Sequence, residues 1–348
     1  MTLLAWVLLA QTVPGAASAQ ASAPGAAWEE RTPDAVGLSR DKLDALRDLA
    51  GGRGCVVRRG ALVYSWGDVT KSADVASAVK PVISTLLMMA VDEGLLPGVD
   101  AKVSDVEPRL TGKNAGITWR HLAGQVSGYG LEEAPGVAYS YNDYALALYY
   151  DALTGKVFRQ AGTEALRGRL GTALGFQDPY TFEAFGPGDR PGRLAISPRD
   201  FARFGLLILR GGRWGDRQVV SAPLTYLSIS APIPATTPRS TGKDGDMIPG
   251  QRTLGGGKNL TPAGPGLYSF NWWLNGEDDR RRQLFVDGPG DLIAALGHGG
   301  KRALWILPSL DLIVSWNESG IDDHDRSPGN PDAKINRAVR LMVESVVR

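Results

Sequence analysis

The sequence predicts an α+β fold: an antiparallel sheet built from both ends of the chain, flanked by helices, with an inserted all-helical subdomain. Strand-like segments occur in a hairpin before residue 67 and return only after residue 267. Between about 95 and 190, helical patterns recur and strand patterns are few. Because strands need a shared sheet to bury their apolar faces, the helical block is expected to interrupt one sheet domain. The expected subdomains are residues 27–83 with 191–348, and residues 84–190.

The chain is expected to begin with a helix and a β-hairpin. Ser39 is a suitable cap for a helix with leucines at helical spacing, which the Gly51-Gly52 pair ends. Two short β-rich runs follow on either side of Arg59-Gly60, a pair suited to a tight turn. Cys55 is the only cysteine and lies in the first run, where we expect a small buried strand residue.

A second helix is expected to start near Ser77, in the segment "ASAVKPVISTLLMMAV". Its apolar residues recur at helical spacing until Gly94. Pro81 is compatible with this helix only in the first turn, where the N–H groups have no intrahelical acceptor. The proline therefore predicts that Ser77 lies at the positive end of the helix dipole.

Further helices and strands complete the expected order. Helices are predicted after Thr118, after Asp143 and over "SPRDFARFGLLILRGG", and a final amphipathic helix over residues 335–346. Strand patterns occur in "YSFNWWLN", "LIAALGHGG" and "ALWILPSLDLIVSWN". The Gly255-Gly257 run lacks the spacing of a phosphate-binding loop and is expected to be a flexible rim loop.

Net charge argues against nucleic-acid binding, and the N-terminal segment indicates export. A net charge of +1 provides no field of one sign that would hold nucleic acid. Residues 1–19 resemble an export signal, with an apolar segment and small residues before the expected cleavage site, although no Lys or Arg precedes that segment. We therefore expect a periplasmic or secreted protein, with no stable membrane span.

The clearest chemical pattern is Ser77-Ala-Val-Lys80. Residues three apart are neighbours on a helix, so the hydroxyl and the amine can touch. A serine becomes a good nucleophile when a base removes its proton, and a lysine can act as that base only in its neutral form. Lowering a lysine pKa by ~3 units costs about 4 kcal/mol, a penalty that an apolar environment can supply.

Together with later motifs, this pattern resembles the serine β-lactamase and penicillin-binding-protein superfamily, and within it the class C-like esterases. The resemblance covers about residues 50–320 and includes "SAVKPVISTLL", "YSYNDY" and "GHGGKRALWILPSLDLIVSW". It implies a β-lactamase/DD-peptidase-like fold and a small-molecule ester, amide or peptide substrate. No His, Cys or carboxylate cluster in the sequence has metal-ligand spacing, so we expect no metal or other cofactor.

The resemblance also implies roles for individual residues. Ser77 would be acylated, with Lys80 and Tyr141 as proton-transfer groups; Tyr139 and Ser140 are alternatives to Tyr141 in register. Asp143 stands where the family usually has Asn, and a carboxylate there would keep the lysine protonated, leaving Tyr141 as the alternative base. The remaining expected site residues are His298 in the catalytic strand motif, Gly299 and Gly300 beside the substrate, Lys301 sharing the oxyanion hole with Ser77 through backbone N–H groups, and Asn271 and Trp273 lining the substrate cleft.

Two functions are compatible with these residues. The first is a serine hydrolase acting through an acyl-enzyme, with esterase-type activity favoured over peptidase or β-lactamase activity. His298 replaces a more familiar lysine, which removes a cation that would attract a carboxylate-bearing substrate. The alternative is a catalytically inactive protein of the same fold that binds cell-wall fragments.

Overall fold

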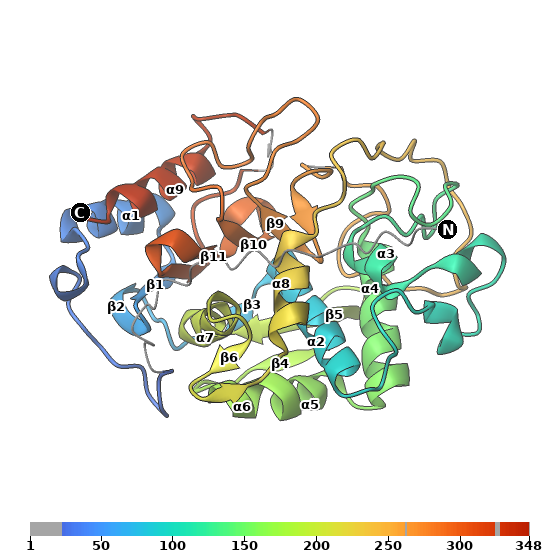
Figure 1. Ribbon diagram of the computed structural model, residues 1–348, viewed down its shortest axis with the longest axis horizontal. Helices are drawn as coiled ribbons and strands as arrows, with labels where there is room; N and C mark the ends of the chain where they lie inside the picture. The colour runs from blue at the N-terminus through green and yellow to red at the C-terminus, as the bar shows by residue number, and fades with distance from the viewer. Residues whose placement is uncertain (1–22, 262, 324–327, 348) are drawn as a thin grey trace, which may run out of the picture.

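The structure is a computed structural model that describes residues 23–261, 263–323 and 328–347. Its centre is a seven-stranded antiparallel sheet in the order β2-β1-β12-β11-β10-β9-β8 (Figure 1). Strands from the start of the chain thus pair with strands from its end, as the sequence predicts, and the α+β class is confirmed. The export signal expected within residues 1–19 lies outside the described residues.

The strands of the large sheet are joined mainly by short hairpins. They are β1 (Arg53–Arg58), β2 (Ala61–Trp66), β8 (Tyr268–Ser269), β9 (Trp272–Leu274), β10 (Ile293–Gly297), β11 (Arg302–Leu307) and β12 (Leu312–Asn317). A three-stranded sheet contains β3 (Ala73–Asp74), β5 (Arg190–Ile196) and β4 (Thr181–Phe185), and a small hairpin contains β6 (Arg213–Trp214) and β7 (Arg217–Gln218).

Helices cover both faces of the large sheet. The α-helices of the described residues are α1 (Arg40–Ala50), α2 (Lys80–Asp92), α3 (Trp119–Ala123), α4 (Asp143–Asp151), α5 (Gly162–Leu166), α6 (Thr172–Leu174), α7 (Pro198–Leu209), α8 (Ala222–Ser230) and α9 (Lys334–Glu344). Helices α1 and α9 lie side by side on one face, and α7 packs on the strands of the other (Figure 1). The sheet therefore separates two apolar cores.

Strand alternation explains the two cores. Cys55 and Val57 contribute to the core that includes α2 and α7, whereas Val56 between them faces α1 and α9. Side chains of a strand point alternately to opposite faces, so a strand buried on both faces must be apolar throughout. Cys55 is fully buried in β1, which confirms the expected small buried strand residue, and burial raises the pKa of its thiol to about 12.

The inserted segment differs in one respect from the sequence-based expectation. Strand β4 and Arg190, the first residue of β5, lie within residues 84–190, which were expected to be all-helical. The segment "TFEAF" does alternate apolar and polar residues before a Gly-Pro-Gly turn, but it is too short to dominate a helical neighbourhood. The hairpin it starts becomes important because it reaches the cleft described below.

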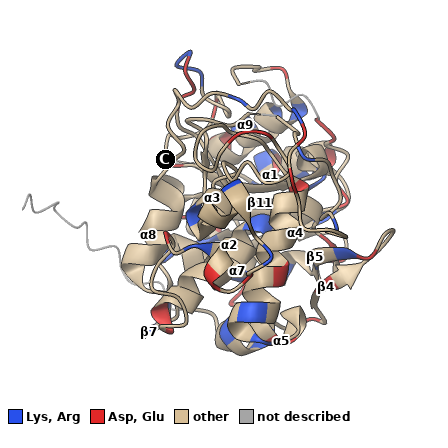
Figure 2. Cartoon of the chain, turned by 90° about the vertical axis from the view of Figure 1, so that its right-hand side faces the viewer, with Lys and Arg blue, Asp and Glu red and all other residues tan. Residues whose placement is uncertain are grey.

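Charged side chains on the outer surface are mixed in sign. On the face drawn in Figure 2, Lys and Arg segments alternate with Asp and Glu segments. Within the described ranges, no helix has both the length and the apolar character needed to cross a bilayer.

Candidate active site

Ser77 and Lys80 lie at the start of the helix that the sequence predicts. A 3₁₀ turn, η2 (Ala76–Val79), carries Ser77 and leads directly into α2, with Pro81 in its first turn. Lys80 Nζ lies 2.7 Å from Ser77 Oγ and donates a hydrogen bond to it. The Lys80 side chain is 1% exposed, so its amine is held inside the protein and not in solvent. The Ser77 hydroxyl and the Lys80 amine are thus in contact, as their three-residue spacing on a helix predicts.

Asp143 supplies the partner that a buried lysine needs. Asn142 caps α4 by accepting hydrogen bonds from the backbone N–H groups of Tyr144 and Ala145, which fixes the first turn of that helix. Asp143 follows the cap and is buried. One of its carboxylate oxygens lies 2.8 Å from Lys80 Nζ.

The charge of Lys80 follows from these contacts. Burial alone would lower the pKa of Lys80, but the charge of Asp143, together with interactions with Tyr141, outweighs it and raises the pKa above its ordinary value of 10.5. The direct contact with the Asp143 carboxylate therefore favours the ammonium form of Lys80, the case in which Tyr141 was expected to be the alternative base.

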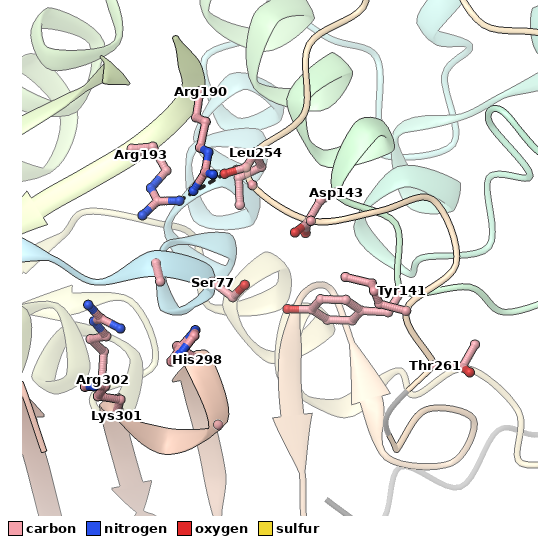
Figure 3. A pocket seen from close by; sticks show the side chains of 15 residues that line it. Ser77, Tyr141, Asp143, Arg190, Arg193, Leu254, Thr261, His298, Lys301 and Arg302 are labelled. Carbon is pink, nitrogen blue, oxygen red and sulfur yellow. Dashed lines mark hydrogen bonds between the residues drawn. The ribbon is translucent and has the colours of Figure 1, made fainter. Parts of the chain in front are cut away.

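Of the three candidate residues at positions 139 to 141, the structure places only Tyr141 beside Ser77 and Lys80. Its ring centroid lies 4.4 Å from Lys80 Nζ and its side chain lines the cleft in front of Ser77 (Figure 3). Tyr139 is fully buried with its hydroxyl donating to the carbonyl of Ala263. The Ser140 hydroxyl bonds to residues of the loop at 258–259.

Asn271 and Trp273 support the site from below, and neither lines the cleft as expected. Asn271 is 2% exposed, and its side-chain N–H₂ donates to the Lys80 carbonyl at 3.2 Å and to Ser84 Oγ at 2.8 Å. Trp273 is buried and stacks on Tyr141, with centroids 5.8 Å apart and an interplanar angle of 16°. The strands β8 and β9 are joined by a tight turn at Asn271, which directs its amide to α2.

The end of β10 closes the other side of the site. A Cβ on Gly297 would lie 2.2 Å from the Val75 carbonyl, so only glycine allows the strand to pack against η2. Gly299 (φ 67°) and Gly300 (φ 100°) then turn the chain into β11. Gly299 borders the cleft, but Gly300 does not: a Cβ there would face Ile321 and Ile335 in the core. Gly300 is thus a turn residue, in contrast to the expectation.

The expected oxyanion role of Lys301 is not compatible with the hydrogen bonding of this turn. Its backbone N–H already donates to the His298 carbonyl at 3.1 Å. The Lys301 carbonyl accepts a hydrogen bond from the Ser319 N–H, so the backbone hydrogen-bonding groups of Lys301 point toward the β12 side of the strand. The backbone groups of the next residue, Arg302, therefore point toward β10. The register of β10 and β11 pairs Arg302 with Gly297.

This pairing orients the backbone N–H of His298. Because the Gly297 carbonyl points toward β11 and a trans peptide holds C=O and N–H in opposite directions, the His298 N–H points away from β11. That is the β9 side of β10, where the turn between β8 and β9 contacts Lys80. The His298 side chain is half exposed, with Nε2 3.7 Å from an Asp322 carboxylate oxygen.

The cleft in front of Ser77 has a volume of about 740 Å³. Its rim includes Leu254, Gly255 and Gly256, so the Gly-rich loop does border the site. The loop is tied to the site by backbone hydrogen bonds from Leu254 to the Asp143 carbonyl and from Asp143 to the Gly257 carbonyl. Sequence reasoning missed three arginines of the cleft, on β5 and at the start of β11 (Figure 3).

Comparisons with known proteins identify the family and the fold. The beta-lactamase family model matches residues 40–321. The chain belongs to the beta-lactamase family. Members of this family are typically serine hydrolases that act through an acyl-enzyme. A search of curated proteins by sequence finds no match.

Several solved structures share the beta-lactamase fold. A class C beta-lactamase from Rhodobacter sphaeroides is 16% identical, with 90% of this chain and 98% of that chain covered and a TM-score of 0.59. A penicillin-binding-protein homolog from Caulobacter crescentus is 15% identical, with 89% and 99% covered and a TM-score of 0.61. EstCE1, described as a hydrolase with promiscuous acyltransferase activity, is 13% identical, with 88% and 97% covered and a TM-score of 0.57. At these identities the likeness establishes the fold.

Proposed function

We propose that this protein is a serine hydrolase that cleaves an ester or amide through an acyl-enzyme on Ser77. The observation that supports it most directly is the contact of Lys80 Nζ with both Ser77 Oγ and the Asp143 carboxylate, at 2.7 and 2.8 Å, at the wall of the cleft. An ammonium has three protons, and its third faces Tyr141. This arrangement places a charged proton donor against the hydroxyl of the candidate nucleophile.

The charge of Lys80 determines the order of proton transfers. Because the ammonium donates to Ser77 Oγ, the hydroxyl proton of Ser77 is free to pass to Tyr141, which accepts it as a phenolate and becomes the neutral phenol as Oγ attacks the substrate carbonyl carbon. The carbonyl π bond breaks and its oxygen becomes an oxyanion. When the tetrahedral intermediate collapses, the leaving group departs with the proton that Tyr141 returns. Water then repeats these steps to release the acid and restore Ser77.

The oxyanion is stabilised by two backbone N–H groups in this proposal. One belongs to Ser77, whose N–H in the first turn of η2 has no intrahelical acceptor. The other belongs to His298, which replaces Lys301 in this role because its N–H faces the side of β10 where Lys80 lies. Each such donor is typically worth roughly 2.7 to 4 kcal/mol of transition-state stabilisation.

Esterase-type or amidase-type activity remains the proposal, ahead of peptidase and β-lactamase activity. Support comes from the motif at the end of β10, which has His298 where the resemblance implies a more familiar lysine, and from the likeness to EstCE1, described as a hydrolase with promiscuous acyltransferase activity. The apolar segment within residues 1–19 supports export to the periplasm or outside the cell as part of the same proposal.

Labelling with a fluorophosphonate probe tests the proposal. The native protein should be labelled at Ser77, and Ser77→Ala should not react. Ser230→Ala is the matched control, because Ser230 is an exposed serine on α8 remote from the cleft, and it should label like the native protein. Equal labelling of native protein and Ser77→Ala, or no labelling and no ester turnover by the folded protein, would favour the non-catalytic binding protein instead.

A further inference from the structure

The walls of the cleft differ sharply in charge from the mixed outer surface. Four residues with cationic side chains line it, namely Arg190, Arg193, Lys301 and Arg302, against a single carboxylate, Asp143. Asp143 is already paired with Lys80 at 2.8 Å. Inside a cleft, charges of one sign attract counter-charges more strongly than on an open surface. The cleft is thus positively charged even though His298 stands in place of the more familiar lysine.

Acidic groups near the cleft neutralise part of this charge. Arg193 forms an ion pair with Asp74 and also donates to the Leu254 carbonyl. Arg302 Nε donates to the Asp74 carbonyl at 3.3 Å. Both arginines thus have polar partners within the fold, and among the described residues the side chains of the other two cations do not.

Arg190 and Lys301 form no ion pair within the described part of the chain. Arg190 is the better placed of the two, because Figure 3 shows its side chain reaching into the cleft above Ser77, whereas Lys301 lies at the lower edge. An arginine presents two parallel N–H donors to one carboxylate, which a lysine cannot do. Arg190 is therefore the candidate anion ligand.

A β-bulge places Arg190 beside Arg193. Residues three apart on a regular strand point to opposite faces. On β5, however, Arg193 pairs with Glu183 and Arg190 pairs with Phe185, so the two residues of β5 between these pairs oppose a single residue of β4. Gly192 absorbs the extra residue at φ 67°. Both guanidinium groups consequently line the cleft.

The rim loop holds these guanidinium groups in place. An ideal Cβ built on Gly255 would lie 3.0 Å from Arg193 Nη1 and 3.4 Å from Arg190 Nη1. The two charges are therefore close to each other and to the loop backbone. In addition, burial and the charge of Arg302 lower the pKa of Arg193. An anion bound at this end of the cleft would relieve the repulsion among the three arginines.

The position of the arginines relative to Tyr141 defines which half of a substrate they meet. In Figure 3, Tyr141 lies on one side of Ser77, and Arg190 and Arg193 lie on the other. Tyr141 is the group proposed to protonate the leaving atom, so the leaving group extends to the Tyr141 side. The acyl portion extends toward the arginines.

We propose that Arg190 binds a carboxylate on the acyl portion of the substrate, so that the enzyme prefers esters or amides of short dicarboxylic acids. This inference rests on the proposed function and adds the substrate class to it. Arg193 and Arg302 contribute to the positive field, while Arg190 makes the direct contact.

A matched pair of substrates tests the inference. The 4-nitrophenyl monoester of adipic acid carries a free carboxylate, and 4-nitrophenyl methyl adipate has the same chain without the charge. Native enzyme should hydrolyse the monoester with a kcat/KM about tenfold or more above that of the neutral diester, the range expected for a charge-assisted contact. The preference should fall as NaCl is raised from about 0.05 to 0.5 M, because salt screens exposed charges.

Variants locate the effect at one residue. Arg190→Gln should reduce the ratio of the two kcat/KM values to near one, and Arg190→Lys should retain part of it. The ratio cancels any general damage to the site. Arg217→Gln is the control, since Arg217 is an exposed arginine on β7 outside the cleft, and it should keep the native ratio. Arg193 is unsuitable as the test because its partner Asp74 bonds to the Ala76 N–H next to Ser77.

The outcomes separate the inference from the function on which it rests. Turnover of both adipates with a ratio near one in the native enzyme, or a native ratio that survives Arg190→Gln, overturns the anion site but leaves the hydrolase intact. Absence of turnover together with absence of Ser77 acylation overturns the proposed function itself. A stronger preference for 4-acetoxybenzoate over its methyl ester than for the adipate pair contradicts the assignment to the acyl side.

Discussion

Replacing Asp143 by Asn removes the counter-charge of Lys80 with little change in shape. At the observed 2.8 Å, two unit charges in an effective dielectric of about 20 attract by about 6 kcal/mol. The orphaned ammonium can escape this loss by releasing its proton, which at pH 7 costs a lysine of ordinary pKa at most about 5 kcal/mol. Deprotonation therefore limits the loss in the free energy of unfolding to about 5 kcal/mol at pH 7, and the expected loss is about 3 to 5 kcal/mol, as for other broken buried pairs.

The pH dependence gives the sign of the effect. In the native protein the pKa of Lys80 is raised, so the stability it contributes is present below pH 10.5 and is lost as pH rises through the folded-state value. In Asp143→Asn the folded-state pKa of Lys80 falls below that of the unfolded chain. The unfolded state then binds more protons, and the deficit of the variant should shrink as pH rises from 7 toward 10.

Urea unfolding of native and variant protein at pH 7, 8, 9 and 10 measures this deficit. Asp100→Asn is the control, because Asp100 pairs with Arg120 on the surface with its side chain 69% exposed, and its loss should cost less than about 1 kcal/mol. A variant as stable as the native protein at pH 7, or a deficit that stays constant with pH, would refute a charged Lys80.

The same substitution also distinguishes the working form of Lys80 in catalysis. If the ammonium is the active form, Asp143→Asn loses ester hydrolysis at neutral pH, and the alkaline limb of its kcat/KM profile moves to lower pH. If a neutral amine were the base, the variant would instead gain activity at neutral pH. A pH profile from 5 to 10 with 4-nitrophenyl acetate separates the two.

Three other outcomes are expected. Tyr141→Phe should reduce kcat for 4-nitrophenyl esters by about 10²- to 10⁴-fold, the range for a lost proton-transfer group, and an unchanged rate in a steady-state assay would remove Tyr141 from the mechanism. Gly256→Ala should lower kcat/KM, because its Cβ would lie 2.4 Å from Asp143 Oδ2 and displace that carboxylate, whereas Gly257→Ala, whose nearest contact is 3.7 Å, should not; equal effects would contradict this. The Cys55 thiol, buried with a pKa raised to about 12, should react with a thiol reagent only on unfolding, and rapid labelling of the folded protein would show it to be accessible.

The sequence was informative where local rules determine structure. Pro81 alone restricts the start of α2 to the neighbourhood of Ser77, and the three-residue spacing then places Lys80 beside it. Apolar runs at both ends of the chain, with helical patterns between them, were sufficient to predict one sheet built from both termini. These inferences needed only the period of apolar residues and the backbone chemistry of proline.

The parts that the sequence could not supply depend on contacts between distant segments. The protonation state of Lys80 is decided by Asp143, which the sequence identified as a source of doubt but could not place at a distance. The role of Lys301 depended on which backbone groups of a four-residue turn are already bonded. Neither the protonation state of Lys80 nor the backbone hydrogen bonding of this turn can be predicted from a sequence motif.

The arginines of the cleft show how such information is hidden. Arg190 and Arg193 are spaced as residues on opposite faces of a strand, so alternation assigns one of them to the outside. Only the bulge at Gly192 brings them to one side, and its sole sequence signal is a glycine following a proline in a strand. A motif at the end of β10 that lacks its usual cation thus says little about the charge of the cleft, because the fold brings three arginines to it from β5 and β11. If this protein is the proposed hydrolase, its substrate preference should accordingly depend on all the residues that face the cleft, and not only on those of the motif at the end of β10.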